Sequence, residues 1–184
     1  MITPKTGLLL IADTTLNDPS FSRSVVLICR HGTADGTVGF TLNELLETTV
    51  AELIEDLQQH PIPLFLGGPV QNDTIHYIHQ YPQYFDDAVQ IMDGVYWGGD
   101  FEKFKTLYKA GKFENDKIKF FLGYSGWDAG QLEEEIAEDS WITCEASKGL
   151  IFDSNYDEIW NACLKKLGGK FELKMHFPTL DQLN

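Results

Sequence analysis

The chain has 184 residues, which is long enough to bury an apolar core without disulfides or metals and short for two independent domains. Hydrophobic residues make up 43% and aromatic residues 12%, so the sequence does not belong with chains that stay disordered for want of apolar surface. With 28 acidic and 14 basic side chains the formal net charge is -14, which disfavours nucleic-acid binding, because a duplex requires clustered Lys and Arg. We expect one acidic domain spanning residues 1–184.

Cysteine usage and hydropathy indicate the compartment. Cys29, Cys144 and Cys163 have no CxxC spacing, and an odd number of cysteines is typical of a reducing environment. The apolar run at residues 8–12 is too short for a signal peptide or a membrane span. These features predict a cytoplasmic protein that does not associate with a membrane.

The first predicted elements are strands. Short apolar runs at residues 7–12 and 25–29 are typical of strands buried on both faces, so we place them at the centre of a sheet. Residues 33–36 signal a hairpin turn, and the alternation of Val38, Phe40 and Leu42 predicts a third strand.

The next element is a helix that begins near Thr49, because Thr49 and Glu52 form a capping-box pair, and it ends before Pro61. Further strands are predicted at residues 63–66, 75–79, 88–92, 95–97, 118–122 and 141–144, and further helices at residues 100–110, 128–138 and 155–167. Most neighbouring strands are too close in sequence for helical crossovers, which favours a largely antiparallel sheet. The tail at residues 169–184 loses periodicity, so we expect it to pack loosely.

A hydrolase is one function to weigh, since the segment from Gly123 to Gly126 resembles a nucleophile elbow around Ser125. The elbow requires glycine two positions after the serine, where this chain has Trp127. We therefore assign no catalytic residue and keep a hydrolase as the least favoured alternative.

Metal ligands are sparse. Cys29 and His31 share a strand face at i and i+2, while His76 and His79 point to opposite faces if they lie on a strand. No third ligand stands at a recognisable spacing, so the sequence predicts no metal site.

Two glycine pairs follow strands, at residues 67–68 and 98–99, but neither fits a dinucleotide or P-loop pattern. We interpret them as tight turns, with Asp100 as the cap of the following helix, and expect no cofactor.

Several stretches resemble a known family in order and spacing. They are residues 7–12, residues 18–27, His31, Gly39, Leu42-Asn43, Gly67-Gly68-Pro69-Val70, His79, Gly123-Tyr124-Ser125-Gly126-Trp127 and residues 131–136. Together they resemble the YqgE/AlgH family of small bacterial proteins, whose members have no settled activity. One departure is Glu44, which stands where a basic residue followed by proline is usual.

The resemblance implies an α+β fold with a strongly bent, partly barrel-like sheet flanked by about four helices. It also implies the label of transcriptional regulator, inherited from the context of alginate production. The sequence shows no helix-turn-helix with a basic recognition face, so we expect regulation through a protein partner rather than by direct DNA binding.

Five polar residues stand in or beside short apolar segments, and we take them as tentative ligand-binding residues. They are Asp18, Arg23, His31, Asn43 and His79. One interpretation makes Arg23 a structural fork that ties Asp18 or loop carbonyls. The alternative function is a small-molecule-binding domain, in which Arg23, His31 and Asn43 line a pocket for a carboxylate or phosphate.

The segment from Trp127 to Leu132 is interpreted as a structural motif that starts a helix. Asp128 can cap the helix, Gln131 can reach back as the capping-box partner, and Trp127 can pack on Leu132. This interpretation predicts a loss of about 1 kcal/mol of stability for Asp128→Ala.

Overall fold

The structure, a computed structural model, describes residues 3–16, 18–32, 34–57, 62–153 and 155–177. Its strands are β1 (Leu8–Ala12), β2 (Val25–Gly32), β3 (Gly36–Thr41), β4 (Leu45–Thr49), β5 (Pro63–Leu66), β6 (Val70–His79), β7 (Val89–Met92), β8 (Val95–Trp97), β9 (Ile118–Trp127) and β10 (Trp141–Glu145). The α-helices of this part of the chain are α1 (Val50–Leu53), α2 (Phe101–Lys109), α3 (Gln131–Ala137) and α4 (Ile159–Leu167). The fold is α+β, as expected.

The ten strands form one sheet in the order β10-β1-β2-β3-β9-β6-β8-β7, with β5 pairing to β9 and β4 to β5. All these pairs are antiparallel except β5 and β9. The prediction of a largely antiparallel sheet is therefore confirmed.

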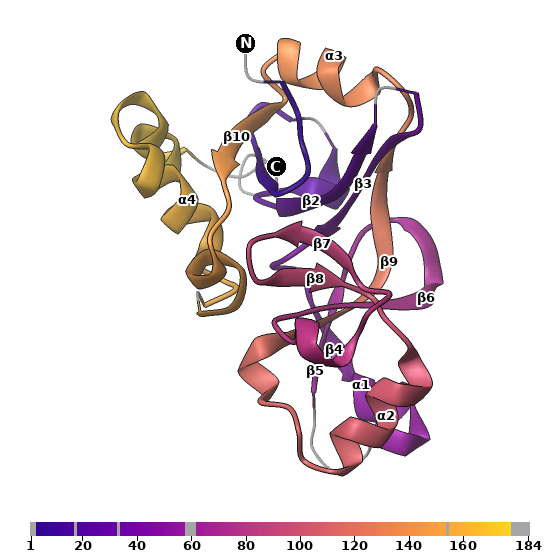
Figure 1. Cartoon of the computed structure of the whole chain (residues 1–184). Helices are drawn as coiled ribbons and strands as arrows, with labels where there is room; N and C mark the ends of the chain where they lie inside the picture. The colour runs from indigo at the N-terminus through magenta and orange to yellow at the C-terminus, as the bar shows by residue number, and fades with distance from the viewer. Residues whose placement is uncertain (1–2, 17, 33, 58–61, 154, 178–184) are drawn as a thin grey trace.

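Strand β9 joins the two halves of the sheet and runs through both of them (Figure 1). Its first half pairs with β5 and β6, and its last residues pair with β3, so that Trp127 lies opposite Thr37. At the far end of the path, β7 packs back towards the first strands, since a Cβ added to Gly7 would lie 3.2 Å from the carbonyl oxygen of Ile91. The sheet is strongly bent, but it is not closed.

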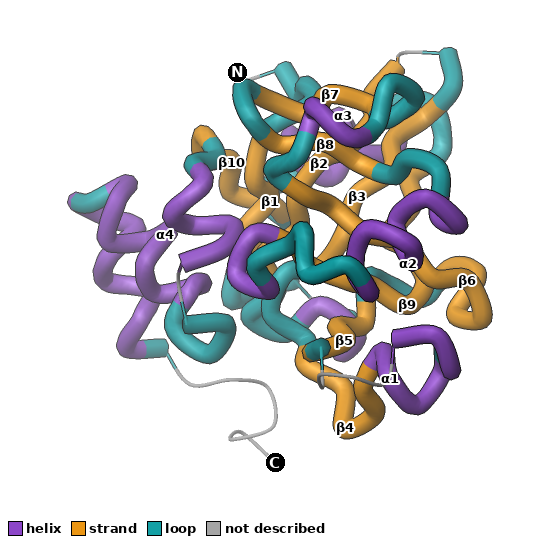
Figure 2. The backbone as a smooth tube through the Cα atoms, turned by 60° about the horizontal axis from the view of Figure 1, so that its bottom comes forward, coloured by secondary structure: helices purple, strands orange, loops and turns teal. Residues whose placement is uncertain are grey.

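Alternation along β1 gives the N-terminal half of the sheet two buried faces. Leu9 and Ile11 pack in a core cluster that includes residues of α4, whereas Leu8 and Leu10 pack in a second cluster with Leu132 of α3. Helices α3 and α4 therefore cover opposite faces of this half, and α4 lies beside β10 (Figure 2).

The other half of the sheet, which contains β6 and β8, has a separate aromatic core beneath α2. Phe104 of α2 is fully buried against Tyr77 of β6 and Phe120 of β9, with ring centroids 4.9 and 5.5 Å away. The helix predicted at residues 100–110 is thus present, and Asp100 caps it as expected by accepting a hydrogen bond from the Lys103 N–H at 3.0 Å.

Strand β9 is longer than predicted, because the segment from Gly123 to Trp127 continues it instead of forming a turn. The glycines of this region allow two backbones to approach closely. A Cβ on Gly68, whose φ is 153°, would lie 2.3 Å from the carbonyl carbon of Tyr124. The pair at residues 67–68 therefore serves close packing against β9, in line with a structural role.

The first helix is shorter than expected. Thr49 precedes α1 as predicted, but its hydroxyl bonds the Glu52 carboxylate and caps no backbone N–H. After one turn the chain continues as a 3-10 turn at Glu55–Leu57, and the predicted end before Pro61 lies outside the described residues. Strand β4, which precedes the helix, was not predicted.

In the predicted loose tail, Gly169–His176 form a 3-10 helix, and Phe177 follows it as the C-cap. Phe171 and Met175 pack against the cluster around α4, and Lys174 forms an ion pair with Asp13 at 2.7 Å. Within the described ranges, no helix is both long enough and apolar enough to cross a membrane.

Candidate functional site

Asn43 has a structural position at the start of β2. Its Oδ1 accepts a hydrogen bond from the Val25 N–H at 2.9 Å, and its Nδ2 donates to the Arg23 carbonyl at 3.0 Å. The amide thus uses both ends to fix the chain where it enters the sheet.

Asp18 and His79 also bond the backbone. Asp18 caps the 3-10 turn Pro19–Phe21 by accepting from the Ser20 N–H at 2.9 Å. His79 is fully buried, accepts at Nδ1 from the Tyr81 N–H and donates from Nε2 to the Gly98 carbonyl at 2.9 Å. Burial lowers the pKa of His79, so the ring is held neutral in this tautomer.

Arg23 and His31 are not brought together. The Arg23 guanidinium lies 5.1 Å from the centre of the Trp160 ring of α4 and donates to the Phe177 carbonyl at 2.9 Å. His31 bonds Thr37 at 2.7 Å, and its Nε2 lies 3.6 Å from Glu133 of α3. Since α3 and α4 cover opposite faces, these residues do not line a common pocket.

Helix α3 does not begin as expected. Its N-cap is Gly130, with φ of 83°, and the Asp128 side chain makes no cap hydrogen bond. The assignment of Asp128 as the cap is therefore wrong. The other half of the motif is present, since Gln131 Oε1 accepts from the Asp128 N–H at 2.9 Å, and Trp127 and Leu132 pack in one cluster.

Ser125 is fully buried in β9. Its hydroxyl donates to the Gly67 carbonyl at 3.0 Å and lies 3.4 Å from the Thr41 hydroxyl. Neither group is a base that could activate a nucleophile. Ser125 therefore ties β9 to the glycine pair, and its contacts give the hydrolase alternative no support.

The motif residues instead line a cavity of about 400 Å³ on the α3 side of the sheet. We call it the indole pocket and define it by Asp18, Phe21, Trp127, Glu135 and Trp141. The two indoles meet edge to face at 5.8 Å, and the Phe21 ring lies 5.4 Å from Trp141. Apolar packing beneath the cavity thus fixes the orientation of its aromatic walls.

Glu135 lies between the two indoles. Its Oε2 accepts hydrogen bonds from the Trp127 Nε1–H at 2.8 Å and the Trp141 Nε1–H at 2.7 Å, and its Oε1 accepts from Gln131 at 2.8 Å. Neutral donors therefore orient the carboxylate, but they do not cancel its charge. Among the residues that the structure describes, Glu135 has no ion-pair partner.

The surroundings of the indole pocket are acidic. A second cavity of about 190 Å³ shares Pro69 with it, and the charged residue in its lining is Glu44. No lysine, arginine or histidine of the described ranges lines either cavity. Carboxylates beside aromatic faces suit an ammonium or guanidinium group, which the negative faces of the rings also attract.

Sequence reasoning missed Glu135 and Trp141 as site residues. Trp127 precedes the helix predicted at residues 128–138, whereas Trp141 begins the strand that follows it, and Glu135 is one of several acidic residues at 133–139. The sequence feature that could have indicated Glu135 is its spacing of four residues from Gln131, which puts both side chains on one face of α3.

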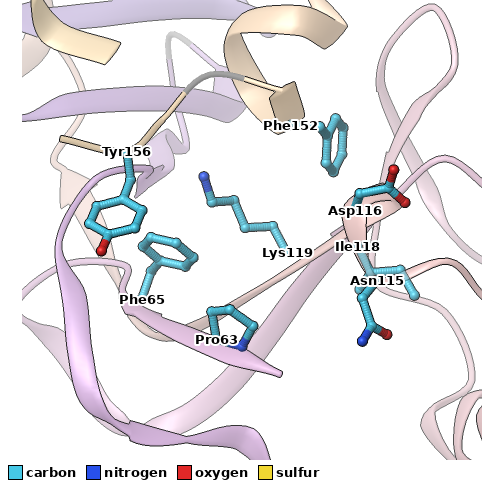
Figure 3. Close-up of a pocket in the computed structure, with 8 residues that line it drawn as sticks. All are labelled: Pro63, Phe65, Asn115, Asp116, Ile118, Lys119, Phe152 and Tyr156. Atoms are coloured by element: carbon cyan, nitrogen blue, oxygen red, sulfur yellow. The ribbon is translucent and has the colours of Figure 1, made fainter. Parts of the chain in front are cut away.

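A third cavity, of about 300 Å³, lies between β5, β9 and the segment before α4 (Figure 3). Lys119 of β9 extends into it beside the rings of Phe65, Phe152 and Tyr156. In the sequence, the only indication of this cavity was that the apolar strand predicted at residues 118–122 contains one lysine.

The remaining groups with possible chemistry are the metal-ligating side chains and the thiols. No group of three or more His, Cys, Asp or Glu side chains within the described ranges is arranged to hold a metal ion. The thiols of Cys29, Cys144 and Cys163 are free and buried.

Comparisons with known proteins place these features in a family. A sequence profile described as AlgH-like matches residues 9–172. A UPF0301 protein of Chlorobium limicola is 42% identical over 178 residues, covering 97% of this chain and 95% of the relative. A UPF0301 protein of Cytophaga hutchinsonii is 39% identical over 179 residues, covering 97% and 98%.

Solved structures agree. The solution structure of the AlgH protein from Pseudomonas aeruginosa matches with a TM-score of 0.75 at 26% identity, covering 97% of this chain and 98% of that one. The crystal structure of protein DIP2367 from Corynebacterium diphtheriae matches with a TM-score of 0.78 at 20% identity, covering 96% and 94%, which shows the shared fold. The chain therefore belongs to the AlgH-like family.

Proposed function

We propose that this protein regulates transcription by binding a protein partner, and that the indole pocket receives a basic side chain of that partner. The observation that carries the proposal is the Glu135 carboxylate, which two indole N–H groups orient and no described cation neutralises. A lysine or arginine inserted beside it would gain a charge-assisted hydrogen bond and aromatic contacts.

Charge supports a protein partner over DNA. The net charge of -14 and the carboxylates of Asp18, Glu44 and Glu135 around the two adjoining cavities would repel phosphates. The negative electrostatic potential of these carboxylates would speed the association of this protein with a basic protein surface. The regulatory part of the proposal rests on the family resemblance.

The proposal is tested by capturing partners from native-cell lysate with the tagged full chain and two matched variants. Glu135→Gln keeps the size of the side chain and removes its charge, whereas Glu134→Gln removes a charge from an exposed neighbour on the same helix. We expect a stoichiometric partner with the parent protein and with Glu134→Gln. Recovery should fall at least about tenfold with Glu135→Gln, because a buried charge pair is lost.

Equal recovery with Glu135→Gln and the parent, or no stoichiometric partner for either, would contradict the proposal. Circular dichroism of Glu135→Gln is the control that distinguishes a loss of partner recovery from unfolding of the variant. Tight binding of the parent to duplex DNA at about 0.15 M salt would also count against a partner-based mechanism.

A further inference from the structure

The cavity around Lys119, which we call the lysine pocket, is separate from the indole pocket. Lys119 lies on β9 opposite Ile78 of β6, and 9% of the residue is exposed. Its side chain points away from the aromatic core that holds its neighbours Ile118 and Phe120. It reaches instead into the space between Phe65, Phe152 and Tyr156 (Figure 3).

The Lys119 ammonium is poorly compensated. Nζ donates to the Ile151 carbonyl at the long distance of 3.3 Å and lies 4.3 Å from the centre of the Phe65 ring. No carboxylate of the described residues lies within ion-pair distance of it. By contrast, Lys117 pairs with Glu114 at 2.7 Å.

A buried ammonium without a carboxylate is costly, because the charge has left water and gained little in return. Burial accordingly lowers the pKa of Lys119 to about 8. The group is still mostly protonated near neutral pH, so the pocket presents a positive charge with donor capacity to spare.

The walls define what could compensate that charge. Phe65, Phe152 and Tyr156 offer apolar ring surface, and the volume of about 300 Å³ is at the lower end of small-molecule sites. The Asp116 carboxylate also lines the cavity, and it would repel a group with several negative charges. A single carboxylate on a small apolar body satisfies both constraints better than a phosphate does.

We propose that the lysine pocket binds a small apolar monocarboxylate, whose carboxylate pairs with the Lys119 ammonium while its apolar body packs against Phe65, Phe152 and Tyr156. This site takes an anion, whereas the indole pocket takes a cation. The two are therefore independent, and either can fail alone.

The probe is phenylacetate, titrated into the isotope-labelled full chain at about pH 7 and followed by the amide resonances of the pocket residues. We expect saturable shifts at residues lining the lysine pocket. Its uncharged analogue phenylacetamide should bind at least about tenfold more weakly to the parent protein, because the ion pair is absent.

Variants separate the charge of Lys119 from general effects. Lys119→Met keeps an unbranched chain of similar size and should weaken phenylacetate binding at least about tenfold. Lys117→Met removes a half-buried lysine two positions away, which does not line the pocket, and should leave the affinity unchanged. Equal affinity of phenylacetate and phenylacetamide for the parent would overturn the proposal even if Lys119→Met did not fold.

The proposal would also be overturned if phenylacetate caused no saturable shift at pocket residues up to about 50 mM. Specific small-molecule sites have dissociation constants far below that concentration. Tighter binding of phenethylamine than of phenylacetate would reverse the assigned charge preference.

Discussion

Arg23 and His31 contact helices on opposite faces of the same sheet: Arg23 lies over Trp160 of α4, while His31 approaches Glu133 of α3. The register shift between Ile28 and Arg30 contributes to this separation, because Cys29 is the extra residue of a bulge. A bulge reverses the alternation of the residues that follow it. Cys29 accordingly packs in the cluster on the α4 side, whereas His31 turns to α3.

Removing the Asn43 amide should destabilise the fold. In Asn43→Ala the N–H of Val25, which is fully buried, and the carbonyl of Arg23 lose their partner. We expect the free energy of unfolding in urea to fall by about 2 kcal/mol. Asn72→Ala, at an exposed position of β6, should change it by less than about 0.5 kcal/mol, and equal effects of the two variants would refute the bridging role of Asn43.

The start of α3 should depend on Gln131 more than on Asp128. Asp128→Ala removes a side chain that caps no helix N–H, so stability should change by less than about 0.5 kcal/mol. Gln131→Ala removes the acceptor of the Asp128 N–H and the donor to Glu135, at a cost of about 1 kcal/mol. Urea melts that rank the two variants in the opposite order would restore Asp128 as the cap.

Lys119 should make stability increase with pH relative to a neutral variant. The pKa of Lys119 is about 8 in the folded state and 10.5 in the unfolded state. Between these two pH values the unfolded chain therefore binds the Lys119 proton more readily than the folded chain does. The penalty is full below about pH 8 and disappears as pH rises towards 10.5. At about 1.4 kcal/mol for each pH unit, this penalty amounts to at most about 3.5 kcal/mol.

The measurement compares urea melts of the parent and Lys119→Met at about pH 7 and about pH 10. The Met variant should be the more stable protein at the lower pH, and the gap should narrow at the higher pH. Lys117→Met serves as the control. A gap that stays constant with pH would show that Lys119 is not desolvated.

His79 should contribute to the loss of stability in acid. Burial lowers its folded-state pKa below the ordinary 6.5, so the stability it supports is present above about pH 6.5 and is lost as pH falls. Protonation would also remove the Nδ1 acceptor of the Tyr81 N–H. Thermal melts between about pH 7 and pH 5 should show a smaller loss for His79→Asn than for the parent, and identical slopes would contradict this role.

Local patterns predicted the strands that turns delimit. Pro63–Leu66 and Val95–Trp97 have the predicted bounds, because Gly and Pro stand close to their ends. The second half of β9 was missed, since Gly123 and Gly126 suggest a turn in isolation. Only the approach of the segment at residues 67–68 explains why glycines are needed within that strand.

The candidate sites depend on contacts between distant segments. Asp18, Trp127 and Gln131 were singled out from the sequence, but their common pocket with Glu135 requires the pairing of β1 with β10, which brings Trp141 alongside. Likewise, the positions of β5 and the segment before α4 leave Lys119 without a carboxylate partner among the described residues. Contacts of this kind, between segments far apart in the chain, leave no hydrophobic periodicity in the sequence from which they could be predicted.

Binding of a basic side chain by the indole pocket is measured most directly through the indole N–H resonances of Trp127 and Trp141. The titrant is N-acetyl-arginine amide, with N-acetyl-glutamine amide as the uncharged comparison. The proposed function predicts saturable shifts of both resonances with the arginine compound, at least about tenfold weaker binding in Glu135→Gln, and no change in Glu134→Gln. Shifts of equal size with the uncharged compound, or binding that does not depend on Glu135, would contradict it.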